Sequence, residues 1–177
     1  MTEPDADNPQ RPTPGIALPA PSIRGLTSDD VDAVVALSLR AWAPVFDSFA
    51  HVLGHQIYRL VYPDWLTTQA AAVRQVCTGE HVFVAEEGGR VAGFAAVVIR
   101  DDDPKTGEID MIAVDPDYQR RGVATALMAW SVDCMRTAGV VVADIGTGGD
   151  AGHEPARRTY EKAGFTALPL VRYYRAL

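Results

Sequence analysis

The chain has 177 residues, of which 47% are hydrophobic and 22% are charged. These values are ordinary for a globular domain and exclude a wholly disordered chain, a collagen, a coiled coil and a disulfide scaffold. The formal net charge of -7 argues against general nucleic-acid binding, because phosphate contacts need clustered lysine and arginine. We therefore expect a chain that buries a real core, has no nucleic-acid partner and suits a cationic substrate better than an anionic one.

The first 21 residues differ in composition from the rest. They contain six of the twelve prolines and have almost nothing to bury, so we predict a disordered tail over 1–21 and a single domain over 22–177. No targeting segment or uncharged apolar run of ~20 residues is visible. Cys77 and Cys134 lack metal-type spacing and indicate free thiols in a reducing compartment. We expect a cytoplasmic protein without a membrane partner.

Helical periodicity dominates up to about residue 80. A short strand at 23–26 and capping residues at 27–30 precede a helix that we expect Pro44 to end. Apolar residues continue at helical spacing beyond this proline, and Asp64 is a candidate cap for a further helix that ends near Gly79.

Strand patterns begin after this helical part. Apolar runs and turn residues predict strands at 81–85, 91–99 and 106–114, a helix at 122–137, a strand at 140–145, a glycine-rich loop at 146–152, a helix at 155–163 and one or two strands within 167–177. Gly88 and Gly89 predict a hairpin turn. This order indicates an α/β protein of the α+β type, with a mixed, mostly antiparallel central sheet of six to seven strands flanked by helices.

One segment, Gln119–Ala124, carries chemistry at the junction of a predicted strand and helix. Small residues at Gly122 and Ala124 allow a ligand to approach the backbone, and the free N–H groups of the helix start favour a pyrophosphate. Arg120 and Arg121 add positive charge. The spacing fits neither the dinucleotide fingerprint nor a P-loop.

Two segments together resemble one known family. Residues 111–128 resemble the acetyl-CoA signature of the GNAT N-acetyltransferases, with Gln119–Ala124 matching its Q/R-x-x-G-x-G/A motif. Residues 156–165, which end in Tyr-Glu-Lys-Ala-Gly-Phe, resemble the next conserved helix of that family. The resemblance implies a GNAT-like acyl-CoA N-acyltransferase fold, acetyl-CoA as co-substrate, no metal, and direct attack of an amine on the thioester in a ternary complex.

The resemblance also implies cofactor contacts. In this family the pantetheine arm pairs with the strand before the motif, which is bulged and splays from its neighbour, and the diphosphate sits on the amides of the helix start. The corresponding residues are Ile112, Ala113, Val114, Arg120, Arg121, Gly122, Val123, Ala124 and Thr125. His153 stands where the family usually has asparagine; it can hydrogen-bond the cofactor arm, act as a base near neutral pH, or simply be a solvated loop residue.

The resemblance assigns Tyr160 as the acid that protonates the departing thiolate. Glu108 lies eleven residues before Gln119, which is the position of the base in some family members. Strand alternation predicts that Glu108, Asp110 and Ile112 share one face, where the two carboxylates would raise one pKa or bind a cationic amine. Asp144 or a chain of waters are the alternatives for the base.

The leading functional hypothesis is an acetyl-CoA-dependent N-acetyltransferase that acts on a primary amine of a small molecule. Two alternatives stay open: an acyl-CoA-binding sensor without turnover, for which the replacement of asparagine by His153 is a weak argument, and a protein N-terminal acetyltransferase. The acyl group is open as well. A terminal strand at 171–177 can pair across a homodimer.

Overall fold

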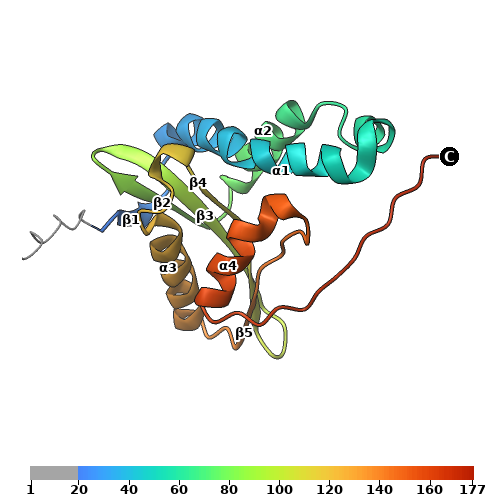
Figure 1. The fold of residues 1–177 in the computed structure, drawn as a ribbon. Coiled ribbons are helices and arrows are strands. Elements are labelled where there is room, and N and C mark those ends of the chain that lie inside the picture. The colour runs from blue at the N-terminus through green and yellow to red at the C-terminus, as the bar shows by residue number, and fades with distance from the viewer. Residues whose placement is uncertain (1–19) are drawn as a thin grey trace, which may run out of the picture.

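The computed structural model describes residues 20–177 and shows a central sheet with helices on both faces (Figure 1). All but the last two residues of the predicted disordered tail lie outside the described part of the chain.

Within residues 20–177, the sheet has five strands in the order β1-β2-β3-β4-β5. They are β1 (Ser22–Gly25), β2 (His81–Glu87), β3 (Arg90–Arg100), β4 (Thr106–Val114) and β5 (Val142–Asp144). The first four strands pair antiparallel, whereas β5 pairs parallel to β4. The prediction of a mixed, mostly antiparallel sheet is therefore confirmed.

In the described part of the chain, four α-helices cover this sheet (Figure 1). They are α1 (Val31–Val61), α2 (Trp65–Val76), α3 (Val123–Thr137) and α4 (Glu154–Lys162), with short 3-10 turns η1 (Ser28–Asp30), η2 (Pro116–Tyr118) and η3 (Ala151–His153). As predicted, Asp64 caps α2, because its side chain accepts a hydrogen bond from the backbone N–H of Thr67.

The core forms two layers, one on each face of the sheet. On one face, residues of α1 and α2 such as Leu37 and Val73 pack with Phe94 of β3. On the other face, residues of α3 such as Met128 pack with Ile109 of β4. Coverage of both faces explains why the centre of β3 is an unbroken apolar run rather than an alternating one.

The predicted number of six to seven strands is wrong, because residues 163–177 form no strand (Figure 1). β5 is only three residues long and offers few backbone partners, and Pro169 cannot donate a ladder hydrogen bond. The C-terminal segment instead runs past α4 to the end of α1, where Tyr174 lies close to Tyr62. It leaves Leu168 and Leu170 exposed.

The expected helix end at Pro44 is also wrong, since α1 continues to Val61. Val45 and Phe46 are buried directly after the proline, so tertiary packing holds the helix together despite the missing N–H donor. The real break is Gly54, whose φ of 70° and ψ of 161° are not helical, so that α1 is two helices joined at a kink.

By length and composition alone, the segment Ser28–Val61 could cross a membrane, with a mean hydropathy of 1.3. Its apolar side chains Val34, Val35 and Leu37 are buried in the core. Core helices of globular domains pass the same test, so the hydropathy of this helix carries no membrane assignment.

Candidate active site

Strand β4 contains a bulge at Asp110. Met111 lies opposite Ala96, whereas Ile109 lies opposite Val97, which leaves Asp110 without a partner across the ladder. A bulge inserts one residue and so shifts the alternation of the side chains that follow. The family-based expectation of a bulge in this strand is met.

The bulge changes which residues share a face. Ile109 and Ile112 both pack on the α3 side, whereas Met111 packs on the α1 side. Glu108 alternates with Ile109 and therefore faces away from Ile112. The prediction that Glu108, Asp110 and Ile112 share one face is wrong, because it assumed a regular strand.

Beyond the bulge, β4 has an open edge. Strand β5 pairs with β4 only over Thr106–Glu108, so in the described part of the chain no strand lies beside Ile112–Val114 on the side away from β3. These residues line a cavity of about 740 Å³ that α1, α2, the start of α3 and α4 complete. An extended ligand can pair with such an edge as an extra strand does.

The cavity gathers most of the predicted site residues: Asp110, Ile112, Ala113, Val114, Arg120, Gly122, Val123, Ala124, Thr125, His153 and Tyr160. Two predicted residues, Glu108 and Arg121, are not in its lining.

The loop before α3 is shaped for close contact between backbone and ligand. Gly122, the N-cap of α3, has a φ of 87°. Because glycine has no side chain, the first helical amides have no side-chain cap. Arg120 has a φ of 62°, an unusual conformation for a residue with a side chain, and it lines the cavity. Because free amides and the helix dipole attract anions, this helix start fits a diphosphate.

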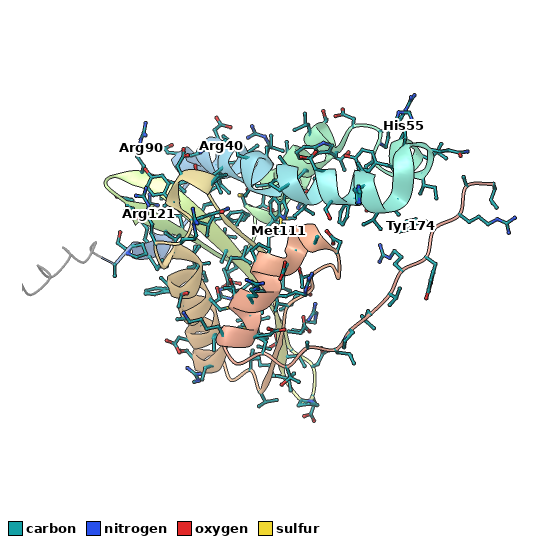
Figure 2. All side chains as sticks on the ribbon, in the orientation of Figure 1. Arg40, His55, Arg90, Met111, Arg121 and Tyr174 are labelled. Carbon is teal, nitrogen blue, oxygen red and sulfur yellow. The ribbon has the colours of Figure 1, made fainter. Side chains whose placement is uncertain are left out.

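The side chain of Arg121 points elsewhere. Its guanidinium pairs with Glu87 at 3.0 Å and lies 5.2 Å from the centre of the Tyr118 ring. Figure 2 shows Arg121 on the Arg90 side of the molecule, away from Met111. A role of Arg121 in phosphate binding stays a prediction, and it rests on the backbone amide rather than on the side chain.

Arg40 of α1 anchors this loop, a contact that sequence reasoning missed. It forms ion pairs with the buried Asp115 and with Asp117, the latter at 3.1 Å. Asp115 also accepts a hydrogen bond from the N–H of Asp117 at 2.9 Å. The long separation between Arg40 and these carboxylates in the sequence hides the contact.

Tyr160 lies on the cavity face of α4, close to the core around Ile109. Burial raises the pKa of its phenol to about 12. The hydroxyl is therefore protonated at neutral pH and can donate a proton or a hydrogen bond.

The two carboxylates of β4 have different surroundings. Partial desolvation raises the pKa of Asp110, the nearby Glu108 raises it further, and Arg100 opposes both effects. Glu108 is ion-paired with Arg100, whose guanidinium also lies 3.9 Å from Asp144. The structure thus brings Asp110 into the cavity, while Glu108 and Asp144 share a cation outside it. Glu108 as base stays a prediction that this geometry does not favour.

The glycine-rich loop 146–152 is docked rather than free. Arg157 donates hydrogen bonds to the carbonyl oxygens of Gly148 and Asp150 at 2.6 and 2.8 Å. The N–H of Gly152 donates to Ser48 of α1 at 3.1 Å, across 104 residues of sequence. No short-range signal predicts these contacts, and sequence reasoning missed Ser48 and Arg157.

A mixed sheet with an open edge, an uncapped helix start and a phenol in one cavity fit an acyl-group transferase that uses an extended, phosphate-bearing acyl donor. The family comparison agrees with the class: the model of the acetyltransferase (GNAT) family matches residues 52–165. The match covers more than half of the chain, and the protein belongs to this family.

Relatives of known name include acetyltransferases with different acceptors. A mycothiol acetyltransferase of Sanguibacter keddieii is 39% identical in an alignment of 139 positions, which covers 73% of this chain and 44% of that protein. The N-alpha-acetyltransferase RimI of Mycobacterium tuberculosis is 34% identical over 109 residues, 60% of this chain and 66% of that protein. The chain spans less than half of the length of the mycothiol acetyltransferases that it matches.

Solved structures show the same fold. The aminoglycoside acetyltransferase AAC(6')-Iy, in complex with the bisubstrate analogue CoA-S-monomethyl-acetylneamine, aligns over 89% of this chain and 98% of its own with a TM-score of 0.61 and 21% identity. A GNAT-family structure from Desulfovibrio desulfuricans aligns over 89% of this chain and 92% of its own, with a TM-score of 0.67 and 23% identity.

Proposed function

We propose that this protein transfers an acetyl group from acetyl-CoA to a primary amine of a small molecule by direct attack in a ternary complex. One observation carries the proposal: a single cavity holds the open edge of β4, the uncapped start of α3 and the partly buried phenol of Tyr160. The family and the relatives named for mycothiol and aminoglycosides support it.

The residues fit acetyl-CoA as co-substrate. The backbone of Ile112–Val114 can pair with the amide-bearing arm, and the amides from Gly122 to Thr125 can receive the diphosphate, with Arg120 adding charge. The reactive end of the arm then lies between Asp110 and Tyr160, which line the same cavity.

Two residues of the cavity have clear chemical tasks. Burial raises the pKa of Tyr160 to about 12, so its hydroxyl is protonated at neutral pH and is the proton donor available to the departing thiolate. The carboxylate of Asp110 attracts a cationic amine to the acyl group. Glu108, which is paired with Arg100 outside the cavity, adds negative charge near Asp110, and Arg100 opposes it.

A second acceptor class has a specific observation in its favour. The identity to RimI supports a protein N-terminal amine as an alternative acceptor. A peptide acceptor needs only its terminal amine in the cavity, so the two classes share the same cofactor contacts.

Calorimetric titration with acetyl-CoA and CoA, followed by a thiol-release assay, tests the proposal. The amine panel contains an amino sugar, a simple aliphatic amine and a short peptide with a free N-terminus. We expect binding and thiol release with an amino sugar. Release only with the peptide would select the second acceptor class. Binding without release from any amine would favour a sensor, and absence of binding would overturn the assignment of the α3 start.

We further propose a homodimer that uses the C-terminal segment, and a cytoplasmic location. Val171 and Tyr173 are 74% and 90% exposed. Exposure of these large side chains to water is unfavourable, and pairing of the segment with another copy would remove it. Light scattering of the purified protein, with and without residues 167–177, tests the dimer, and a monomer in both cases would contradict it. Cell fractionation tests the location.

A further inference from the structure

A histidine–aspartate pair lies at the start of α4. Nδ1 of His153 is 2.6 Å from Oδ1 of Asp150, and the two side chains are only 16% and 10% exposed. The His153 ring also lies against Phe49 of α1, with the ring centres 5.5 Å apart. His153 lines the acyl-transfer cavity. A histidine held on two sides and open to a reaction cavity differs from a solvated loop residue.

The carboxylate of Asp150 is held in its ionised form. Burial by itself raises the pKa of Asp150, but hydrogen bonds with Ser48 and His153 outweigh burial, so the pKa is lowered. The backbone N–H of Gly152 donates to Oδ2 at 3.0 Å. Since an ionised carboxylate only accepts hydrogen bonds, Nδ1 of His153 carries a proton, and in the neutral imidazole this tautomer has Nε2 as the acceptor.

The surrounding loop leaves the pair little freedom. A Cβ atom at position 148 would lie 2.5 Å from Nδ1 of His153, and a Cβ atom at position 152 would lie 2.8 Å from Cβ of Ser48. The guanidinium of Arg157 fixes two carbonyl groups of the loop. Glycine at these positions is therefore required by the close packing around the pair.

His153 and Tyr160 are placed for one reaction. They are seven residues apart, which is two helical turns, and Ala156 and Thr159 between them also line the cavity. Of the other candidate bases, Glu108 is ion-paired with Arg100 outside the cavity lining.

We propose that Nε2 of His153 is the general base that deprotonates the acceptor amine, with Asp150 as a positioning residue that holds the imidazole in the required tautomer. This inference rests on the proposed function. Of the three protons of the ammonium group, one goes to Nε2 before attack and then to solvent. One stays in the amide, and one replaces the proton that Tyr160 passes to sulfur. The nitrogen–carbon bond forms and the carbon–sulfur bond breaks.

The test compares His153→Asn and Asp150→Asn with His55→Asn, an exposed histidine at the far end of α1 (Figure 2). Calorimetry gives the Kd for acetyl-CoA, and thiol release gives kcat for the amine that the wild-type protein uses. We expect His153→Asn to keep the Kd within about threefold and to lose about 100-fold or more in kcat, the range of a general base. Asp150→Asn should lower kcat at an unchanged Kd, and His55→Asn should change neither value.

Added imidazole separates a base from a structural residue. It should restore part of the rate in His153→Ala, which a merely structural role would not allow. A kcat of His153→Asn within about threefold of wild type would overturn the inference, because asparagine can replace a hydrogen bond but not a base. Wild-type protein that binds acetyl-CoA and acetylates no amine would overturn the proposed function itself, and the inference with it.

Discussion

The two walls of the cavity are built in different ways. The wall formed by β4 and the start of α3 comes from one continuous stretch, 106–125, and its bulge and uncapped amides are properties of that stretch. The opposite wall is assembled from loop 146–152 and α4, docked on α1 through Ser48 and Phe49. A local wall suits a cofactor that is common to a whole family, whereas an assembled wall can differ between relatives and set the chemistry of the acceptor.

The largest expected effect concerns the assembled wall. Replacement of Tyr160 by phenylalanine removes the acid and leaves the local wall intact, so kcat should fall about 100-fold or more while the Kd for acetyl-CoA stays within about threefold. Steady-state thiol release and calorimetry measure the two quantities. Tyr173→Phe, in a 90% exposed position, is the control. An equal loss of kcat and of affinity for acetyl-CoA would mean that the two walls do not have separate roles in catalysis and in cofactor binding.

Docking of the loop is tested by Gly152→Ala. The added Cβ would lie 2.8 Å from Cβ of Ser48 and 3.0 Å from Cα of Val45, so the loop must move away from α1, at a cost of about 1–3 kcal/mol. We expect lower kcat and a lower urea midpoint. Gly149→Ala is the matched control, because its Cβ would meet no atom within 4 Å. Equal behaviour of both variants would show that the loop is not held by this contact.

The local wall is tested by Gly122→Ala. A Cβ there meets no atom within 4 Å, but the φ of 87° costs about 1–2 kcal/mol for a residue with a side chain. Relief of this strain moves the first amides of α3, so the Kd for acetyl-CoA should rise about tenfold while the rate at saturation changes little. Gly25→Ala, without a positive φ or a close neighbour, should bind as wild type does. Unchanged binding by Gly122→Ala would remove the diphosphate from this helix start.

The smallest effect is expected for Asp110, at the bulge of the local wall. Its raised pKa means that the ionised carboxylate disfavours the folded state slightly at neutral pH, and that this cost disappears as the pH falls through the raised pKa. Asp110→Asn should therefore unfold at the same or a slightly higher urea concentration at pH 7. The gain in free energy of unfolding should be well under 1 kcal/mol, because the side chain is exposed.

In the same variant, KM for a cationic amine should rise severalfold at pH 7, and wild type should approach the variant as the pH falls. KM measured across the acidic range checks this expectation. A pH-independent KM in wild type would contradict a role of this carboxylate in amine binding.

Much of the local wall was predictable. The Gly88–Gly89 hairpin, strand β4 and helix α3 follow from turn residues and apolar patterns, and the structure confirms them. The strands predicted after α4 failed for a non-local reason: a strand needs a partner edge, and an apolar pattern alone does not supply one. The predicted helix end at Pro44 was wrong because burial of the residues after the proline outweighed its helix-breaking effect.

The sequence by itself determined the family, the order of helices and strands up to α4 and the uncapped start of α3, because these depend on signals within one or two turns of chain. Only the tertiary structure decided that a bulge places Glu108 and Ile112 on opposite faces, that Arg121 pairs with Glu87, and that Asp150 holds His153 in the cavity. The first two outcomes depend on strand register or on a partner far away in the chain, and the third depends on docking of loop 146–152 against Ser48 and Phe49 of α1. None of these contacts is encoded in local composition.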